Sequence, residues 1–427
     1  MAEVSAYKWF EKNFDSINEY FEGSRVVDAS TGKASFTGFA FDDVLEIISS
    51  GFQTKTDSLD GLKRIAVRQL LFDGSWSHPI TLEEMTKRLR EKLRTLRGRE
   101  KRYTFLAGIY AQGELKQRRF AVNGSIIMLY PPTVPLPKRV LKLARIQEEG
   151  FQNISDYESV ADRKLNKTVL TISLSARSSE EAGSLAYDRF DEFRGILNFI
   201  RNYGKHSASS WGQSQETRVF NNFVGFRYSS LHDGGSGELV GSYLQKHWKL
   251  PSVIGKLSGA NAGIFHENVE SCLKGLRSKH GLSADCWKAL GSYASSLDTP
   301  GYQAAFLKAW SLLEFLTVIN PGDDHTKIVR RVSFLYSDVG AVRLMLDHLR
   351  HRRNELVHSG GEEEFVSEEK LVHQINRYLV RLLNQYIFNH HNFSNRSEFA
   401  QFLDCSVDVS FLEKRVSLFS RALDFRK

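Results

Sequence analysis

The hydrophobic pattern between positions 342 and 358 predicts a helix with one apolar face. Apolar residues recur there about every 3.6 positions, at Val342, Met345, Leu346, Leu349, Leu356 and Val357. Position 353 should continue this stripe, but it holds an arginine. Gly360 and Gly361 follow, and glycine tolerates the left-handed backbone in which helices end. We therefore expect a helix that ends near His358 and carries Arg353 on its apolar side.

A second helix is predicted from Gln303 to Ile319, where nearly every residue is apolar. Its one carboxylate is Glu314. Because an unpaired buried charge is costly, we expect Glu314 to pair with Arg353, or with its neighbour Arg352, across two packed helices. The pair would orient an arginine for chemistry, or it would be a fixed ion pair with no catalytic purpose.

The pattern before this region mixes helices and strands. Helices are expected over residues 6–22, 41–51 and 179–203, and strands over 103–111, 118–123, 125–130 and 168–176. Asn123-Gly124 predicts a tight hairpin turn. Residues 203–241 are rich in Gly, Ser and Asn and are expected to be irregular, and helices resume near Phe265. The predicted fold class is an α+β N-terminal region followed by an all-α helical bundle.

The length of 427 residues favours more than one domain. We expect an α+β sensing or binding region over 1–240 and a helical region over 241–427. The run PPTVPLPK from Pro131 to Lys138 holds four of the eight prolines and indicates a possible further boundary.

The composition favours a cytoplasmic protein. Hydrophobic residues make up 41% and charged residues 25%, as in ordinary globular proteins. No uninterrupted apolar run reaches about 18 residues, so no transmembrane helix and no membrane partner are expected. The three cysteines are scattered, which predicts neither a disulfide framework nor a zinc site.

The net charge of +8 lies entirely in the first 290 residues, because the rest of the chain is neutral. Nine basic residues and two acidic ones occupy positions 87–102. Thr81 and Glu84 form a capping-box pattern, and Leu82, Met85, Leu89, Leu93 and Leu96 make an apolar stripe, so this segment is predicted to be a helix. Three interpretations of this basic helix are open. Its charged side is a solvated face, or it is a platform for a nucleic-acid backbone, or, less favoured, it binds a membrane surface. The candidate RNA-binding residues are Lys87, Arg88, Arg90, Arg94 and Arg97.

Arg353, Asn354 and His358 together suit phosphodiester chemistry that needs no metal. Arginine forks onto phosphate oxygens, and histidine takes or gives a proton near neutral pH. Asn354 and His358 are four residues apart and share one helix face. No phosphate-binding glycine loop, hydrolase elbow or zinc-protease motif occurs in the chain, so no cofactor and no metal are expected.

This motif resembles the R-x(4–6)-H signature of HEPN domains, in the variant where a polar residue follows the arginine. The flanking sequence is similar too, with a long helix containing Trp310 and Glu314 before the motif and an amphipathic helix from Lys370 to Phe388 after it. The similarity covers about residues 290–392, and is greatest to the HEPN domains of ApeA-type bacterial anti-phage proteins.

The resemblance implies a metal-independent endoribonuclease that acts as a homodimer and serves as a toxin-like effector in abortive anti-phage defence, with an unknown phage-derived or cellular trigger. His358 would be the general base or acid, Arg353 would hold the scissile phosphate of the RNA, with tRNA as one candidate substrate, and Asn354 would orient His358 or contact the phosphate. Attack by the RNA 2′-hydroxyl would leave a 2′,3′-cyclic phosphate and a 5′-hydroxyl. The alternative is an inactive module for RNA binding or dimerisation.

Overall fold

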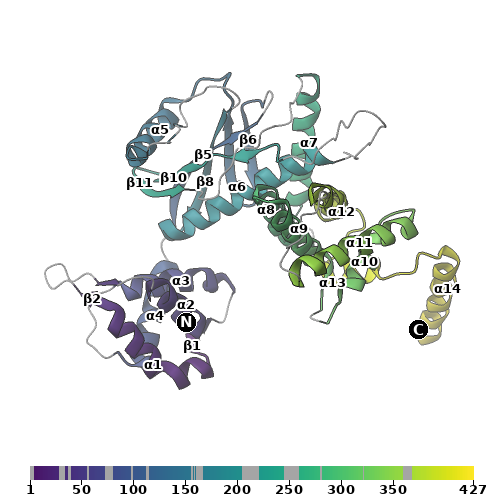
Figure 1. Ribbon diagram of the computed structural model, residues 1–427, viewed down its shortest axis with the longest axis horizontal. Helices are drawn as coiled ribbons and strands as arrows, with labels where there is room; N and C mark the ends of the chain where they lie inside the picture. The colour runs from purple at the N-terminus through teal and green to yellow at the C-terminus, as the bar shows by residue number, and fades with distance from the viewer. Residues whose placement is uncertain are drawn as a thin grey trace. The chain divides into compact units, whose positions relative to one another are not determined.

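The computed structural model describes most of the chain. Its described residues are 4–27, 34–36, 40–54, 57–72, 80–97, 100–111, 115–154, 157, 159, 167–203, 221–244, 259–278, 281–320, 322–358 and 368–427. An α+β region comes first along the chain, and a region of many helices follows it (Figure 1). The expected order of fold classes is therefore present.

The chain forms two compact units. The first contains residues 1–105, 173–186 and 230–242, and the second contains residues 106–172, 187–229 and 243–427.

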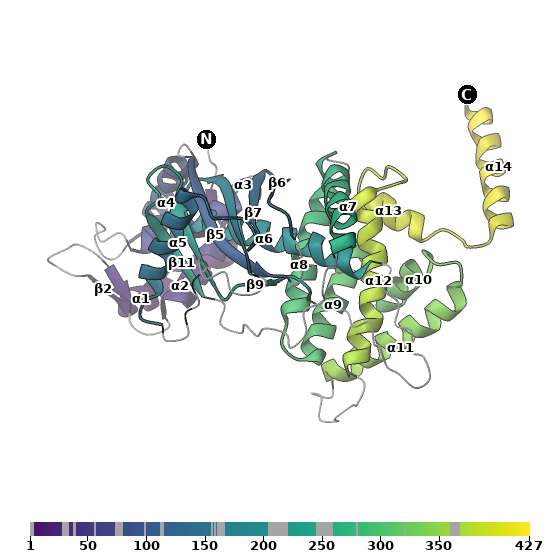
Figure 2. The same cartoon turned by 90° about the horizontal axis from the view of Figure 1, so that it is seen from above.

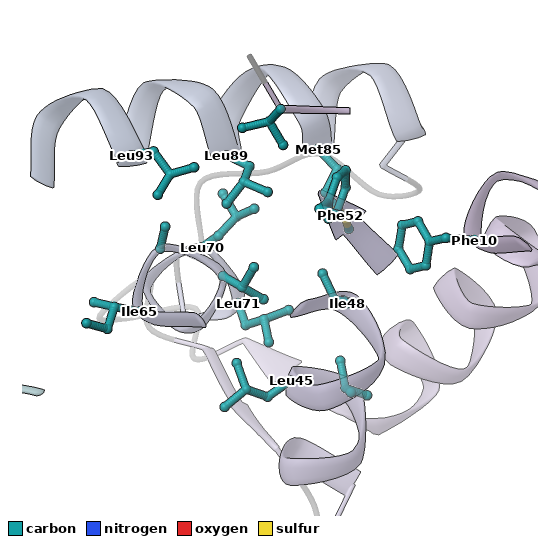
Figure 3. Close-up of a cluster of buried hydrophobic side chains, with 14 of the residues drawn as sticks. Phe10, Leu45, Ile48, Phe52, Ile65, Leu70, Leu71, Met85, Leu89 and Leu93 are labelled. Atoms are coloured by element: carbon teal, nitrogen blue, oxygen red, sulfur yellow. The ribbon is translucent and has the colours of Figure 1, made fainter. Parts of the chain in front are cut away.

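Four helices build the core of the first unit. They are α1 (Lys8–Ser24), α2 (Ala40–Gly51), α3 (Asp57–Leu71) and α4 (Leu82–Arg97). Two small antiparallel sheets accompany them, one of β1 (Val4–Ala6) with β4 (Phe52–Thr54) and one of β2 (Arg25–Val27) with β3 (Ala34–Phe36). Figure 3 shows side chains from the helices and β4 meeting in one apolar cluster, which includes Phe10, Ile48, Phe52, Leu70 and Leu89.

The predicted basic helix is α4, and its start follows from its sequence. The Thr81 hydroxyl accepts a hydrogen bond from the Glu84 backbone N–H at 3.2 Å, which is the helix-side half of a capping box. Met85, Leu89, Leu93 and Leu96 are buried in the cluster of Figure 3. The apolar face is therefore used for packing, and the basic residues take the remaining faces.

A larger sheet contains seven strands in the order β11-β10-β5-β8-β7-β6, with β9 paired to β5. The strands are β5 (Lys101–Tyr110), β6 (Arg118–Val122), β7 (Ser125–Tyr130), β8 (Lys167–Ala176), β9 (Val224–Gly225), β10 (Tyr228–Asp233) and β11 (Leu239–Leu244). β6 and β7 form the predicted antiparallel hairpin, in which Asn123 and Gly124 both adopt positive φ, 40° and 83°. Two further helices belong to this part of the chain, α5 (Lys138–Phe151) and α6 (Ser179–Asn202).

The C-terminal helices begin at Gly259. They are α7 (Gly259–Arg277), α8 (Ser283–Asp298), α9 (Tyr302–Thr317), α10 (His325–Ser333), α11 (Val339–His358), α12 (Glu368–Phe388), α13 (Arg396–Leu403) and α14 (Val409–Arg426). α9 packs on α8 and α12, and α10 packs on α11 (Figure 2). Trp310, Tyr293, Tyr378 and Tyr386 are fully buried between these helices. No described helix is long and apolar enough to cross a membrane.

The expectation of irregular structure over residues 203–241 was wrong for its last part. β10 and β11 form there, and the Gly234–Gly237 turn between them is closed by the Asp233 carboxylate, which accepts from the backbone N–H groups of Gly235 and Ser236 at 2.9 Å each. The strands have only six residues each, and neighbouring strands of the sheet supply the hydrogen bonds that local propensity does not indicate.

Candidate functional site

Arg353 on α11 and Glu314 on α9 form an ion pair. The Arg353 Nη2 atom lies 3.7 Å from the Glu314 Oε1 atom, and the two side chains are 24% and 28% exposed. The predicted pairing across two packed helices is therefore present, with Arg353. Because both side chains keep part of their surface open to water, the guanidinium retains N–H groups that another anion could reach.

The same carboxylate oxygen of Glu314 has two further partners. The indole Nε1 of Trp310, one turn earlier on α9, donates to it at 2.8 Å. The Nδ1 atom of His325, at the start of α10, lies 3.3 Å from it. Trp310 is 1% exposed, so its indole is fixed by the surrounding core. One oxygen thus joins α9, α10 and α11.

Asn354 and Arg352 lie on either side of Arg353 in the sequence and differ in their contacts. The Asn354 Oδ1 atom accepts a hydrogen bond from the Arg353 Nη1 atom at 3.3 Å. The Arg352 Nη1 atom donates to the Glu355 carboxylate at 2.6 Å. Asn354 therefore supports Arg353 directly, whereas Arg352 is engaged with a residue of its own helix.

His358 is the last residue of α11, as the sequence predicts. Its side chain is exposed and makes no hydrogen bond or ion pair with the described residues. Asn354 is one helical turn before it on the same face. The acidic residues Glu362, Glu363 and Glu364 lie outside the described residues, and Glu369 pairs with His373 at 3.7 Å.

The segment that carries His325 is held by a buried ion cluster. The Arg331 guanidinium donates to the Thr317 carbonyl at 2.6 Å, to Asp323 at 2.7 Å and to Asp404 at 2.8 Å. The side chain of Asp323 has no exposed surface. Hydrogen bonds from Lys327 and Arg331 hold the pKa of Asp323 far below its usual range. The cluster ties the start of α10 to the end of α9 and to the residue after α13.

Sequence reasoning missed both His325 and Arg331. The one local signal is Asp324, whose carboxylate caps α10 by accepting from the Lys327 backbone N–H at 2.9 Å. Recognising that cap would have placed His325 at the first turn of a helix. Its proximity to Glu314 depends on the packing of α10 and could not be read from spacing.

The five candidate RNA-binding residues of α4 fall into three groups. Lys87 and Arg94 are exposed and have no ion-pair partner among the described residues. Arg88 pairs with Glu84 at 2.7 Å, and Arg90 donates to the Val4 carbonyl at 2.8 Å. Arg97 ends the helix, and its side chain lies outside the described residues. Arg90 thus connects α4 to β1 through a hydrogen bond, a structural role that the sequence did not indicate.

Within the described residues, no three His, Cys, Asp or Glu side chains form a group that could hold a metal ion. What the candidate site offers is one oriented guanidinium, an amide and two imidazoles. These groups can bind an anion and transfer protons.

The chain matches no protein-family model, and neither a curated protein nor a solved structure matches it.

Proposed function

We propose that this protein is a metal-independent endoribonuclease with Arg353, Asn354 and His358 at its active site. The observation that carries the proposal is the placement of Arg353, whose guanidinium is oriented by Glu314 and Asn354 and stays partly open to solvent. A guanidinium held in a fixed orientation needs little reorganisation to bind a phosphate. Electrostatic catalysis requires this property.

In the proposed reaction, Arg353 binds the non-bridging oxygens of the scissile phosphate and stabilises the charge that develops on them. The 2′-oxygen forms a bond to phosphorus as its proton passes to a base, and the bond from phosphorus to the 5′-oxygen breaks as that oxygen receives a proton. His358 performs one of these two proton transfers. The products are a 2′,3′-cyclic phosphate and a 5′-hydroxyl. The nucleophile belongs to the substrate, so DNA is not cleaved.

The biological role that this activity favours is abortive anti-phage defence in the cytoplasm. A ribonuclease that cuts cellular RNA, such as tRNA, harms its host unless it is restrained. The proposed protein is a homodimer whose N-terminal α+β region responds to a phage-derived or cellular trigger and releases the activity of the helical region.

A second candidate function is an RNA-binding or dimerisation module without catalysis. The observation that favours it is the set of three partners around one oxygen of Glu314. Such a junction joins three helices and would persist for structural reasons alone. In that case Arg353 would position α11, and His358 would be an ordinary surface histidine.

A substrate that lacks the 2′-hydroxyl nucleophile distinguishes the ribonuclease from the binding module. An RNA oligonucleotide and a matched oligonucleotide with a single 2′-deoxy substitution at the cleavage position are incubated with the protein in excess EDTA. The ribonuclease cuts the first and leaves the second intact at that position. A binding module binds both and cuts neither. Cleavage of the substituted substrate at the same phosphate would contradict the proposed nucleophile.

A further inference from the structure

A cavity of about 800 Å³ lies in the second unit, on a part of α9 that the candidate active site does not use. Its walls come from α6, α8, α9 and the β6–β7 turn. Cavities of roughly 300 to 1,000 Å³ are the usual size of small-molecule sites. On α9 the cavity takes Lys308, Ser311 and Phe315, whereas Trp310 and Glu314 point about 130° away around the helix.

The acidic wall on α6 is largely neutralised by its own partners. Glu192 is 5% exposed and accepts hydrogen bonds from Arg189 at 2.6 Å and Asn123 at 3.0 Å. Asp191 accepts from the fully buried Arg194 at 2.6 Å. Asp188 has no ion-pair partner among the described residues, which leaves one free carboxylate on this wall.

Two lysines that make no ion pair with the described residues line the cavity from α8 and α9. Lys288 on α8 and Lys308 on α9 both line the cavity and are exposed, and neither makes an ion pair or hydrogen bond within the described residues. Ser292, Ser295 and Ser311 line the cavity from the same two helices. Unpaired ammonium groups beside hydroxyl donors are the side chains that bind phosphate.

The lining residues of this wall are spread along the lengths of α8 and α9. Only residues 299–301 connect α8 to α9, so the two helices run antiparallel. The register places Lys308 level with Ser292, and it places Phe315 level with Ala284 and the buried Trp287. Lys308 and Ser292 therefore lie toward the α8–α9 connection, whereas Trp287 and Phe315 lie farther along the helices, and Lys288 follows Trp287 directly in α8.

We propose that this cavity binds a ribonucleoside phosphate. Lys288, Lys308 and the serine hydroxyls hold the phosphates, Asp188 accepts a hydrogen bond from a ribose hydroxyl, and the base lies toward Trp287 and Phe315. The proposal does not rest on the ribonuclease activity, since the cavity and the Arg353–Glu314 pair use different faces of α9.

Binding to the full-length protein is measured by titration calorimetry in EDTA, with ATP, 2′-deoxy-ATP, adenosine and inorganic pyrophosphate as probes. We expect ATP to bind more tightly than pyrophosphate and than 2′-deoxy-ATP, and adenosine to bind most weakly. Absence of binding by both ATP and pyrophosphate would overturn the proposal, and so would adenosine binding as tightly as ATP.

The variants locate the binding. Lys288→Ala with Lys308→Ala should weaken ATP binding about tenfold or more, because each lysine contributes a charge-assisted bond to phosphate. The matched control, Lys274→Ala with Lys370→Ala, removes two other exposed lysines of the same unit and should leave the ATP affinity unchanged.

Ser292→Trp fills the cavity and should abolish ATP binding, which gives a second readout if the lysine variant is poorly folded. Asp188→Asn should reduce the preference for ATP over 2′-deoxy-ATP. If the ATP affinity is unchanged in both the lysine and the Ser292 variants, ATP binds elsewhere and the assignment of this cavity is wrong.

Discussion

The carboxylate of Glu314 lies 3.7 Å from the guanidinium of Arg353, and the two residues come from helices that are separated by α10 in the chain. The same oxygen also receives the Trp310 indole N–H. An arginine placed on the apolar side of a helix thus has a partner whose own orientation is fixed by the core. Several measurable consequences follow from this arrangement.

Removing the charge of Glu314 should impair catalysis more than folding. Glu314→Gln keeps the size of the side chain but releases Arg353, and misplacing a catalytic group by about 1 Å can cost roughly 100-fold in rate. The pair is partly exposed, so its contribution to stability is about 1 kcal/mol or less. Cleavage rate and thermal unfolding are measured on the same samples. Glu355→Gln, which changes the partner of Arg352, is the control and should keep the cleavage rate within about threefold of the wild-type value. Equal rates for Glu314→Gln and wild type would remove Glu314 from the site.

The roles of His358 and His325 can be distinguished by substitution. His358→Ala should lower cleavage by about 100-fold or more, the effect expected when a general acid or base is lost. His325→Ala should act through Glu314 and lower it about tenfold. His351, which is 73% exposed on α11, is the control. If His325→Ala is the more damaging change, the roles assigned to the two histidines are reversed.

The buried ion cluster should dominate the stability of the C-terminal helices. Arg331→Ala removes the buried guanidinium that binds Asp323, Asp404 and the Thr317 carbonyl, and losing one partner of a buried ion pair costs about 3–5 kcal/mol. The neighbouring Arg330 also pairs with Asp404, but it is 46% exposed, so Arg330→Ala should cost about 1 kcal/mol or less. Urea unfolding followed by tryptophan fluorescence measures both variants. A similar loss in the two would mean that burial does not decide the strength of this cluster.

Asp323 also gives the protein an acid-sensitive element. Hydrogen bonds from Lys327 and Arg331 lower the pKa of Asp323 in the folded state below its unfolded value of about 4. Its stabilising contribution is therefore complete above about pH 4 and is lost as the pH falls toward the folded-state pKa. Asp323→Asn should lower stability at neutral pH and flatten this acid-dependent loss. Asp347→Asn, on the surface of α11, should leave the profile unchanged. A wild-type profile that is flat below pH 4 would contradict the assignment.

The basic residues of α4 should contribute to RNA affinity. Lys87→Glu with Arg94→Glu should weaken RNA binding and reduce the dependence on salt, by a slope of about 0.7 for each lost phosphate contact on single-stranded RNA. Arg90→Ala should instead lower stability, because Arg90 holds the Val4 carbonyl. If the RNA affinity of the double variant is unchanged at every salt concentration, α4 does not bind RNA and its basic residues form a solvated face.

Local sequence signals predicted elements whose stabilising contacts are also local. The stripe from Leu82 to Leu96 and the Thr81 cap predicted α4, and Asn123-Gly124 predicted the β6–β7 hairpin. The Glu314–Arg353 pair was predictable for a different reason, because one carboxylate stood in an apolar helix and one arginine in an apolar stripe.

The features that escaped prediction depend on distant partners. β10 and β11 are stabilised within a sheet whose strands come from four separate parts of the chain. Arg331 is buried because Thr317, Asp323 and Asp404 converge on it, and its own neighbours in sequence indicate an exposed basic residue. The cavity beside α9 likewise exists only once α6 and α8 are packed. There, a side chain at Gly195 would collide with the Leu290 carbonyl, which shows how closely these two helices approach.

The proposed ribonuclease activity is tested by cleavage of end-labelled tRNA and total RNA in excess EDTA, with wild type, Arg353→Ala and His358→Ala compared after equal folding is verified. Wild type should cut and leave 2′,3′-cyclic phosphate and 5′-hydroxyl ends, and both variants should lose this activity. Cleavage by either variant at the wild-type rate, or products with other ends, would contradict it.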